Sequence, residues 1–196
     1  MTEAEQDYSV EDTSIDWESL FLHMAQLMSL KSKDPSTKVG AVIAHNNIPV
    51  SVGFNGFPRG IRECESTKCA LHGDEKNILD SHRWKRPEKY QRAEHAERNA
   101  IYNAARLGIK LEGSTLFCTH LPCDACARAI IQAGIKRVVY NRSNKWQRLG
   151  KGESSQPTRD ACMDMLEEAG VEFCGVYPKV NLQFVPIPTQ RSNHDC

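Results

Sequence analysis

The segment His95-Ala96-Glu97 and, further along the chain, the segment Pro122-Cys123-Asp124-Ala125-Cys126 decide how this sequence is interpreted. Together they offer one imidazole, two thiolates and one carboxylate. Three nitrogen or sulfur ligands leave a tetrahedral zinc ion with an open fourth position, which is the arrangement of a catalytic zinc site. The predicted zinc ligands are therefore His95, Cys123 and Cys126. Glu97 lies two residues from a ligand and is predicted to transfer protons next to the metal.

Both segments are expected at helix N-termini. Cys123 and Cys126 are three residues apart, which places them on one face of a helix. Pro122 suits a helix start, and the partial positive charge of a helix N-terminus favours thiolate over thiol. Apolar periodicity predicts a second helix after His95. Two facing helix N-termini would then hold the metal between them.

A structural zinc, or a pair of reduced buried cysteines, is the alternative interpretation, because a Cys-x2-Cys pair alone is more often structural than catalytic. A closed structural site needs a fourth ligand, and the sequence has no second Cys-x2-Cys or His-x3-His pair at a suitable spacing. The upstream His-x-Glu and the proline before Cys123 favour the catalytic interpretation.

Composition describes an ordinary globular protein. The chain has 196 residues, of which 40% are hydrophobic and 26% charged, and this suits one domain with a full core. Lys plus Arg equal Asp plus Glu at 25 each, so no basic bias points to nucleic acid and a small ligand is expected. No apolar run predicts a transmembrane helix, and the acidic start is unlike a secretory signal. The eight cysteines are therefore expected as reduced thiols in the cytoplasm.

Helices and strands are expected to alternate, which predicts an α/β fold with helices on both faces of one sheet. The first helix is expected to use Ser14 as its N-cap, to expose His23 and to end before Asp34-Pro35. Cys118, Cys162 and Cys174 are expected in the core. The later elements are a hairpin of residues 39–44 and 50–54 with its turn at 45–49, helices at 94–107, 123–133 and 158–168 with Thr158 as a cap, and strands at 113–119, 136–140 and 171–176.

One domain is expected from residue 14 to residue 178, after a disordered lead-in at 1–13 and before an irregular tail at 179–196. Residues 61–93 are interpreted as a polar insertion, and a segment of that length is uncommon in a compact domain unless it is functional or bound to a metal. Three residues in it can supply ligands for a second, structural zinc, with free thiols as the alternative: Cys64, Cys69 and His72. The basic residues of 83–92 alternate with acids and predict a solvated face.

The chain resembles the cytidine deaminase superfamily, and within it the deoxycytidylate deaminases. The pattern His-x-Glu…Pro-Cys-x-x-Cys is the signature of zinc-dependent nucleobase deaminases. The resemblance covers Leu30 to about Phe173 and implies a three-layer α/β/α cytidine-deaminase-like fold with a five-stranded mixed sheet. Its motifs are Ser32-Lys33-Asp34-Pro35, Lys38-Val39-Gly40-Ala41-Val42, Gly53-Phe54-Asn55-Gly56, His95 to Ala100, and Leu121 to Cys126 with Ile130 to Ile135.

The resemblance implies hydrolysis of dCMP to dUMP and ammonia, which supplies dUMP for thymidylate synthesis, in hexamers controlled by dCTP and dTTP. It makes Glu97 the proton shuttle and Asn55 a contact to the sugar or base of the substrate. Arg106 matches an arginine that lies near subunit contacts. Three cations near Asn55 in the sequence are candidates for binding the 5′-phosphate: Lys33, Lys38 and Arg59.

One departure from the family pattern leaves the substrate open. Family members commonly have Asp-Lys-Tyr after the strand that follows the cysteine helix, with the tyrosine near the substrate phosphate, whereas this chain has Ser143-Asn144-Lys145-Trp146. Another cytosine nucleotide (dCTP, CMP or a 5-modified dCMP) is therefore an alternative substrate. The remaining alternatives are a nucleic-acid cytosine or adenine deaminase and a non-catalytic zinc-binding module, which would not need Glu97.

Overall fold

The computed structural model describes residues 14–63, 81–143 and 156–179. The lead-in, nearly all of the tail, and the second-zinc candidates Cys64, Cys69 and His72 lie outside these ranges. In chain order the elements are α1 (Trp17–Ser29), β1 (Gly40–His45), β2 (Ile48–Phe54), the 3-10 helix η1 (His82–Trp84), α4 (Glu88–Arg92), α5 (Ala96–Arg106), β3 (Thr115–Cys118), α6 (Asp124–Gln132), β4 (Arg137–Asn141), α8 (Gln156–Glu168) and β5 (Glu172–Val176).

The strands form one five-stranded sheet in the order β2-β1-β3-β4-β5. β1 pairs antiparallel with both β2 and β3, whereas β3, β4 and β5 run parallel to one another. A parallel neighbour needs a crossover connection, and α6 and α8 supply the two that the parallel strands require. The prediction of a mixed five-stranded sheet is confirmed.

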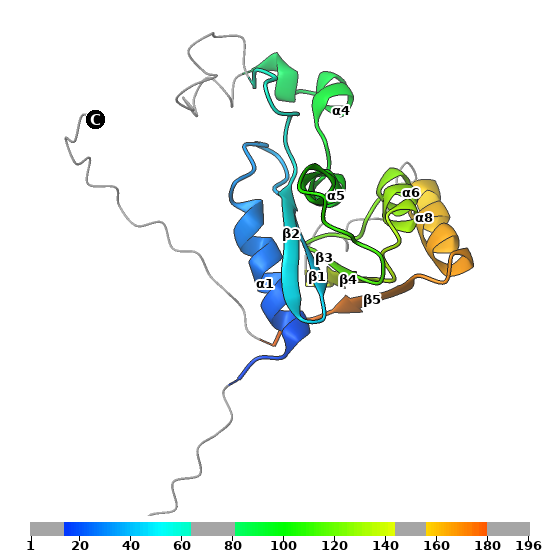
Figure 1. Cartoon of the computed structure of the whole chain (residues 1–196). Coiled ribbons are helices and arrows are strands. Elements are labelled where there is room, and N and C mark those ends of the chain that lie inside the picture. Colours follow the sequence, from blue (N-terminus) through cyan, green and yellow to red (C-terminus); the bar gives the residue numbers. More distant parts are fainter. Residues whose placement is uncertain (1–13, 64–80, 144–155, 180–196) are drawn as a thin grey trace, which may run out of the picture.

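Helices cover both faces of the sheet (Figure 1), and so the three-layer prediction is confirmed. On one face α1 packs Phe21 and Leu22 against Val42, Phe117 and Val139 of the strands. On the other face α5, α6 and α8 form the larger apolar cluster, whose members include Ala100, Ala104, Ile130, Leu166 and the strand residues Ile43, Leu116 and Val138. The alternation of side chains along β1 sends Val42 to one cluster and Ile43 to the other.

Glycines let two helices approach the sheet closely. A Cβ atom on Gly53 of β2 would lie 2.2 Å from the carbonyl oxygen of Ala96 and 2.4 Å from the amide nitrogen of Ala100, both in α5. A Cβ atom on Gly40 of β1 would lie 1.9 Å from the carbonyl oxygen of Ala25 in α1. Real Cβ atoms do not occupy such positions, so only glycine permits this packing. Gly53 therefore fixes the height of the N-terminal half of α5 above the sheet.

Two details of the first helix differ from the sequence prediction. Asp16, and not Ser14, is the N-cap of α1, and its carboxylate accepts a hydrogen bond of 2.7 Å from the backbone N–H of Ser19. Aspartate is as good an N-cap as serine, so composition alone could not choose between them. The prediction that His23 is a surface residue is wrong, because His23 is only 5% exposed.

The hairpin is confirmed, but its turn is shorter than predicted. β1 extends through His45, and only Asn46 and Asn47 remain between the two strands. Both asparagines have positive φ, 51° and 61°, which suits a tight two-residue hairpin turn. Near the C-terminus, Thr158 lies inside α8, which begins at Gln156, and so it is not the cap that was predicted.

The described second half of the 61–93 insertion packs on the loop that follows β2. Trp84 of η1 is 4% exposed, and its ring stacks on that of Phe57 with centroids 4.2 Å apart. Two backbone hydrogen bonds of 3.1 and 2.8 Å join Gly56 and Glu94, just after α4. These contacts place α4 beside the N-terminus of α5. None of the helices in the described ranges is both long and apolar enough to cross a membrane.

Candidate metal centre

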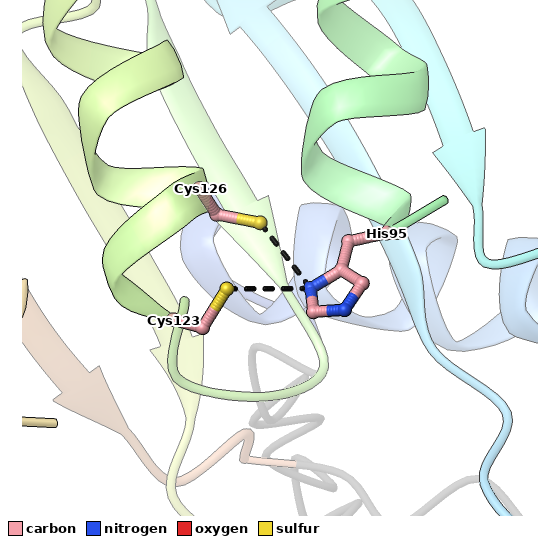
Figure 2. A group of neighbouring side chains, drawn as sticks. All are labelled: His95, Cys123 and Cys126. Atoms are coloured by element: carbon pink, nitrogen blue, oxygen red, sulfur yellow. Dashed lines mark hydrogen bonds between the residues drawn. The ribbon is translucent and has the colours of Figure 1, made fainter. Parts of the chain in front are cut away.

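The three predicted ligands come together at two helix N-termini (Figure 2). His95 is the N-cap of α5 and Cys123 is the N-cap of α6, and neither side chain caps its own helix. Cys126 lies on the first turn of α6 and points to the same place as Cys123. Because the side chains are not used to cap the helices, they are available to a shared ligand.

The spacing of the donor atoms suits a zinc ion. The Sγ atoms of Cys123 and Cys126 each lie 3.4 Å from Nδ1 of His95. Sulfur and nitrogen ligands of one tetrahedral zinc are expected about 3.6 Å apart, given bond lengths of about 2.3 and 2.0 Å. The residues present therefore fit zinc, and three protein ligands leave a fourth position. In the parts of the chain that the structure describes, this is the cluster of His and Cys side chains able to bind a metal.

The surroundings favour the thiolate form that binds metals. A hydrogen bond from the Cys126 thiol and another from His95 lower the pKa of Cys123 to about 4, although burial opposes the shift. The hydrogen bond to Cys123 and burial raise the pKa of Cys126, because the two sulfurs share one proton. A coordinated cation deprotonates its thiol ligands, so zinc would convert both cysteines to thiolates.

Glu97 lies on the first turn of α5, two residues after His95, and is 3% exposed. Burial raises the pKa of its carboxyl above the ordinary value, although the nearby His95 opposes the shift. A carboxyl whose pKa moves toward neutrality can both accept and donate a proton near the working pH. Glu97 is not part of the cluster of potential metal ligands, and its role in proton transfer stays a prediction.

A cavity of about 280 Å³ opens onto the cluster. His95, Glu97 and Cys123 line one part of it, and the other walls come from residues 34–39, from Asn55, from α4 with its flanks, and from the loop before α6. Such a volume lies at the lower end of the range for small-molecule sites. The cavity can therefore admit a small molecule next to the metal cluster.

Asn55 lines this cavity, but its side chain is largely used within the protein. Its Nδ2 donates to Oδ2 of Asp34 at 3.1 Å and to the carbonyl oxygen of Thr37 at 2.8 Å, and its Oδ1 accepts from the backbone N–H of Val39 at 2.8 Å. Both amide hydrogens are therefore used, and one lone pair of Oδ1 remains for a ligand. Contact of Asn55 with the substrate stays a prediction. If the contact exists, Asn55 can only accept a hydrogen bond from the substrate through Oδ1.

Lys33 and Arg59, predicted as phosphate-binding candidates, lie on a second cavity of about 530 Å³. Lys33 forms an ion pair of 2.5 Å with Glu63 there. Glu94 lines both cavities, and its bridge to Gly56 runs between them. The structure therefore does not bring Lys33 to the cavity of the metal cluster, and its role in substrate binding stays a prediction. Lys38 lines neither of these two cavities.

Sequence reasoning missed two basic residues of the 61–93 insertion that line the metal cavity, Arg86 and Lys89. They were expected on a solvated face, but Nζ of Lys89 lies 2.5 Å from Oδ2 of Asp34, whose side chain is fully buried. Ser36 accepts a further hydrogen bond of 2.7 Å from the same ammonium group. A buried aspartate needs a partner. Asp34 of the Ser-Lys-Asp-Pro motif was therefore the one sequence feature that could have predicted an ion pair with a cation distant in sequence.

His120, in the loop before α6, also lines the cavity. Burial lowers the pKa of its imidazole to about 4, so the ring is neutral at neutral pH. Its Nδ1 lies 3.0 Å from Oγ1 of Thr119. A neutral ring adds no charge to the space beside the metal ligands.

Comparison with known proteins gives a consistent result. Residues 15–142 match the family model of the cytidine and deoxycytidylate deaminase zinc-binding region. The chain is 41% identical over 156 residues to an uncharacterised deaminase in the luxG 3′ region of Aliivibrio fischeri, which covers 80% of this chain and 90% of that protein. It is 35% identical over 169 residues to the deoxycytidylate deaminase of Pongo abelii, with 86% and 84% covered.

A solved structure is similar as well. The dCMP deaminase of cyanophage S-TIM5 in complex with dCMP and dUMP superposes with a TM-score of 0.55 at 27% identity, covering 81% of this chain and 96% of that one. The family match includes all three residues of the His-Cys-Cys cluster. The chain therefore belongs to the cytidine and deoxycytidylate deaminase family and is a deaminase with a zinc-binding domain.

Proposed function

We propose that this protein hydrolyses dCMP to dUMP and ammonia and so supplies dUMP for thymidylate synthesis. The proposal is carried by the cluster of His95, Cys123 and Cys126, two of which, His95 and Cys123, line one cavity of about 280 Å³ together with buried Glu97. The choice of nucleotide is supported by relatives named deoxycytidylate deaminase and by the cyanophage enzyme with bound dCMP and dUMP.

The residues divide the work between binding the metal and moving protons. His95, Cys123 and Cys126 would hold zinc, and a zinc ion with three protein ligands makes water nucleophilic at neutral pH. Glu97 accepts a proton from the attacking water and delivers it to the ring nitrogen N3. It then takes the proton of the new hydroxyl at C4 and gives it to the amino group, which leaves as ammonia while the C4–O bond becomes a carbonyl. The balance is one water consumed and one ammonia released.

Asn55 is proposed to contact the sugar as an acceptor only. Its two amide hydrogens already bind Asp34 and Thr37, so its Oδ1 is the atom left to receive a hydrogen bond. A sugar hydroxyl can donate that bond. Replacing Asn55 by alanine is expected to weaken dCMP turnover, both by removing this acceptor and by releasing Asp34 from one of its partners.

A turnover screen tests the assignment. Zinc-loaded protein is incubated with dCMP, deoxycytidine, CMP, dCTP, 5-methyl-dCMP and a cytosine-containing single-stranded oligonucleotide, and the products are separated by chromatography. The expected result is that dCMP exceeds deoxycytidine in kcat/KM by orders of magnitude, because a site built to bind a ligand group discriminates strongly against analogues that lack it. Equal values for nucleoside and monophosphate, or preference for the oligonucleotide, would refute the nucleotide assignment.

The role of Glu97 is tested separately. Glu97→Gln keeps the size of the buried side chain but cannot accept a proton, so kcat should fall by roughly 10²- to 10⁴-fold while the bound zinc, measured by elemental analysis, is unchanged. Glu94→Gln is the matched control, because Glu94 also lines the cavity and its hydrogen bond to the backbone of His95 can be kept by glutamine. An equal loss of kcat in Glu97→Gln and Glu94→Gln would contradict a specific role of Glu97 in proton transfer.

The proposal also covers the oligomeric state, the effectors and the location of the protein. We propose a homo-oligomer, a hexamer by family resemblance, with dCTP and dTTP as effectors, in the cytoplasm. Exposed Tyr102 and Leu107 near Arg106 support a contact surface on this side of α5. Sedimentation of the wild-type protein with and without each triphosphate measures the oligomeric state, and a monomer at all concentrations would contradict it.

A further inference from the structure

Three cations line the cavity of the metal cluster, and two of them are paired with carboxylates of the same cavity. Lys89 pairs with Asp34 at 2.5 Å, and Arg98 pairs with Glu94 at 2.5 Å. Those positive charges are therefore balanced inside the protein, and neither cation can turn to a ligand without leaving a carboxylate unpaired.

Arg86, just before α4, differs from both. The central carbon of its guanidinium lies 5.4 Å from the centroid of the Tyr90 ring, and Tyr90 also lines the cavity. No ion pair joins Arg86 to a carboxylate within residues 14–63, 81–143 and 156–179. An aromatic face positions an arginine without neutralising its charge, since the cation–π attraction leaves the N–H groups free to donate.

The residues that line the cavity differ in burial. Glu97, beside the metal cluster, is buried, whereas Arg86 and Tyr90 are exposed. An uncharged pyrimidine ring can enter the buried end at modest cost, but a phosphate dianion cannot, because burying an unpaired charge is expensive. A nucleotide with its base at the metal cluster therefore places its phosphate toward the exposed end of the cavity, where Arg86 lies.

We propose that Arg86 binds the 5′-phosphate of the nucleotide substrate and sets the preference for nucleotide over nucleoside. The inference rests on the proposed function and assigns the phosphate contact to a residue of the insertion and not to Lys33, Lys38 or Arg59. The planar guanidinium offers paired N–H donors that match two phosphate oxygens, so lysine is expected to replace it only in part.

Steady-state kinetics with dCMP and deoxycytidine test the proposal on the zinc-loaded, full-length protein. Arg86→Ala should raise KM for dCMP by roughly ten- to hundredfold, the value of a hydrogen bond to a charged group, with little change in kcat. Turnover of deoxycytidine should stay unchanged, and Arg86→Lys should recover part of the loss. Lys85→Ala is the matched control, because Lys85 is the exposed neighbouring cation and does not line the cavity.

A binding measurement gives a readout that does not depend on turnover. Calorimetric titration with dUMP and with deoxyuridine should show that Arg86→Ala weakens only the phosphorylated ligand. A wild-type protein that deaminates dCMP while Arg86→Ala keeps its KM and its dUMP affinity would refute the assignment of Arg86 alone. Equal losses on dCMP and deoxycytidine would show that Arg86 supports the fold and not the phosphate. A wild-type protein inactive on dCMP would refute the proposed function together with this inference.

Discussion

The two sides of the cavity are built in different ways. On the metal side, α5 buries Ala96, Glu97, Ala100 and Ala104, and it lies so close to β2 that only Gly53 fits beneath it. On the opposite side, α4 has no buried residue. Polar contacts hold it, chiefly the ion pair of Lys89 with Asp34. The reacting groups are thus fixed by apolar packing and backbone geometry, whereas the α4 wall, which lies beside Arg86, is held by charge.

This difference suggests that the metal side carries out the reaction and that the α4 side determines which substrate binds. Apolar packing at crystal-like density tolerates few displacements, which suits ligands whose donor atoms must lie 3.4 Å apart. In the α4 wall, a side chain that has no buried partner can be replaced at small cost to stability. Substitutions on the metal side should therefore abolish the reaction or the fold, and substitutions on the α4 side should change what the enzyme accepts.

The largest effect is expected from Cys126→Ser. A serine hydroxyl is a poor replacement for a thiolate ligand, so zinc should be lost and deamination should fall below detection. Cys174→Ser is the control, because Cys174 is a half-buried thiol of β5 outside the metal cluster. Elemental analysis and a dCMP turnover assay measure both proteins. Full zinc content in Cys126→Ser would exclude Cys126 as a ligand.

The second prediction concerns the attachment of α4. Lys89→Met leaves the fully buried carboxylate of Asp34 without its cation, and breaking such a pair should lower the free energy of unfolding by about 3 kcal/mol. Arg128→Met is the control, since its pair with Asp124 is exposed and should contribute less than about 1 kcal/mol. Urea denaturation compares the variants. Adding Asp34→Asn to Lys89→Met removes the unpaired carboxylate and should restore most of the lost free energy of unfolding. If it does not, the broken Lys89–Asp34 ion pair is not the cause of the loss.

The third prediction returns to the metal side. Gly53→Ala places a methyl group 2.2 Å from the Ala96 carbonyl oxygen, so α5 must move away from β2. Overpacking of this kind costs about 1 to 3 kcal/mol, and the shift of His95 should lower zinc affinity as well. Gly56→Ala is the matched control, because its nearest neighbour would be a ring atom of Phe54 at 3.8 Å. Equal stability of the two variants would contradict the close-packing argument.

The metal side was predictable from sequence because its determinants are local. Spacing along one helix places Cys123 and Cys126 together, and a proline or a glycine marks the ends of α5 and α6. The alternation of helices and strands then requires a layered sheet. Residue spacing could not choose between two equally good N-caps of α1, Ser14 and Asp16. It also could not predict that His23 is buried, because that burial depends on the strands that α1 covers.

The α4 side was not predictable in the same way, because its determinants are contacts between residues far apart in sequence. Lys89 reaches Asp34 across 55 positions, the difference between the two residue numbers, and nothing in the alternating charges of the insertion singles it out. Asn55 shows the same limit. Its type and motif suggested a substrate contact, but its bonds to Asp34, Thr37 and Val39 also make it a brace for the cavity wall.

The smallest effect is expected from His120, which lines the cavity from the loop before α6. Its folded-state pKa of about 4 is below the ordinary value of 6.5, because burial disfavours the charged ring. Between pH 6.5 and 4, His120 is therefore protonated in the unfolded chain but neutral in the folded protein. Stability is complete above about pH 6.5 and falls by about 1 kcal/mol for each unit of acidification through this window.

His120→Gln should remove that slope, because glutamine does not titrate. Protonation of the zinc ligands acts on both proteins alike, so the difference between their unfolding free energies at pH 6.5, 5.5 and 4.5 isolates His120. The difference should grow in favour of the variant as the pH falls. Parallel pH profiles would mean that the folded protein accepts the proton on His120, and the ring would then add a positive charge to the cavity in acid.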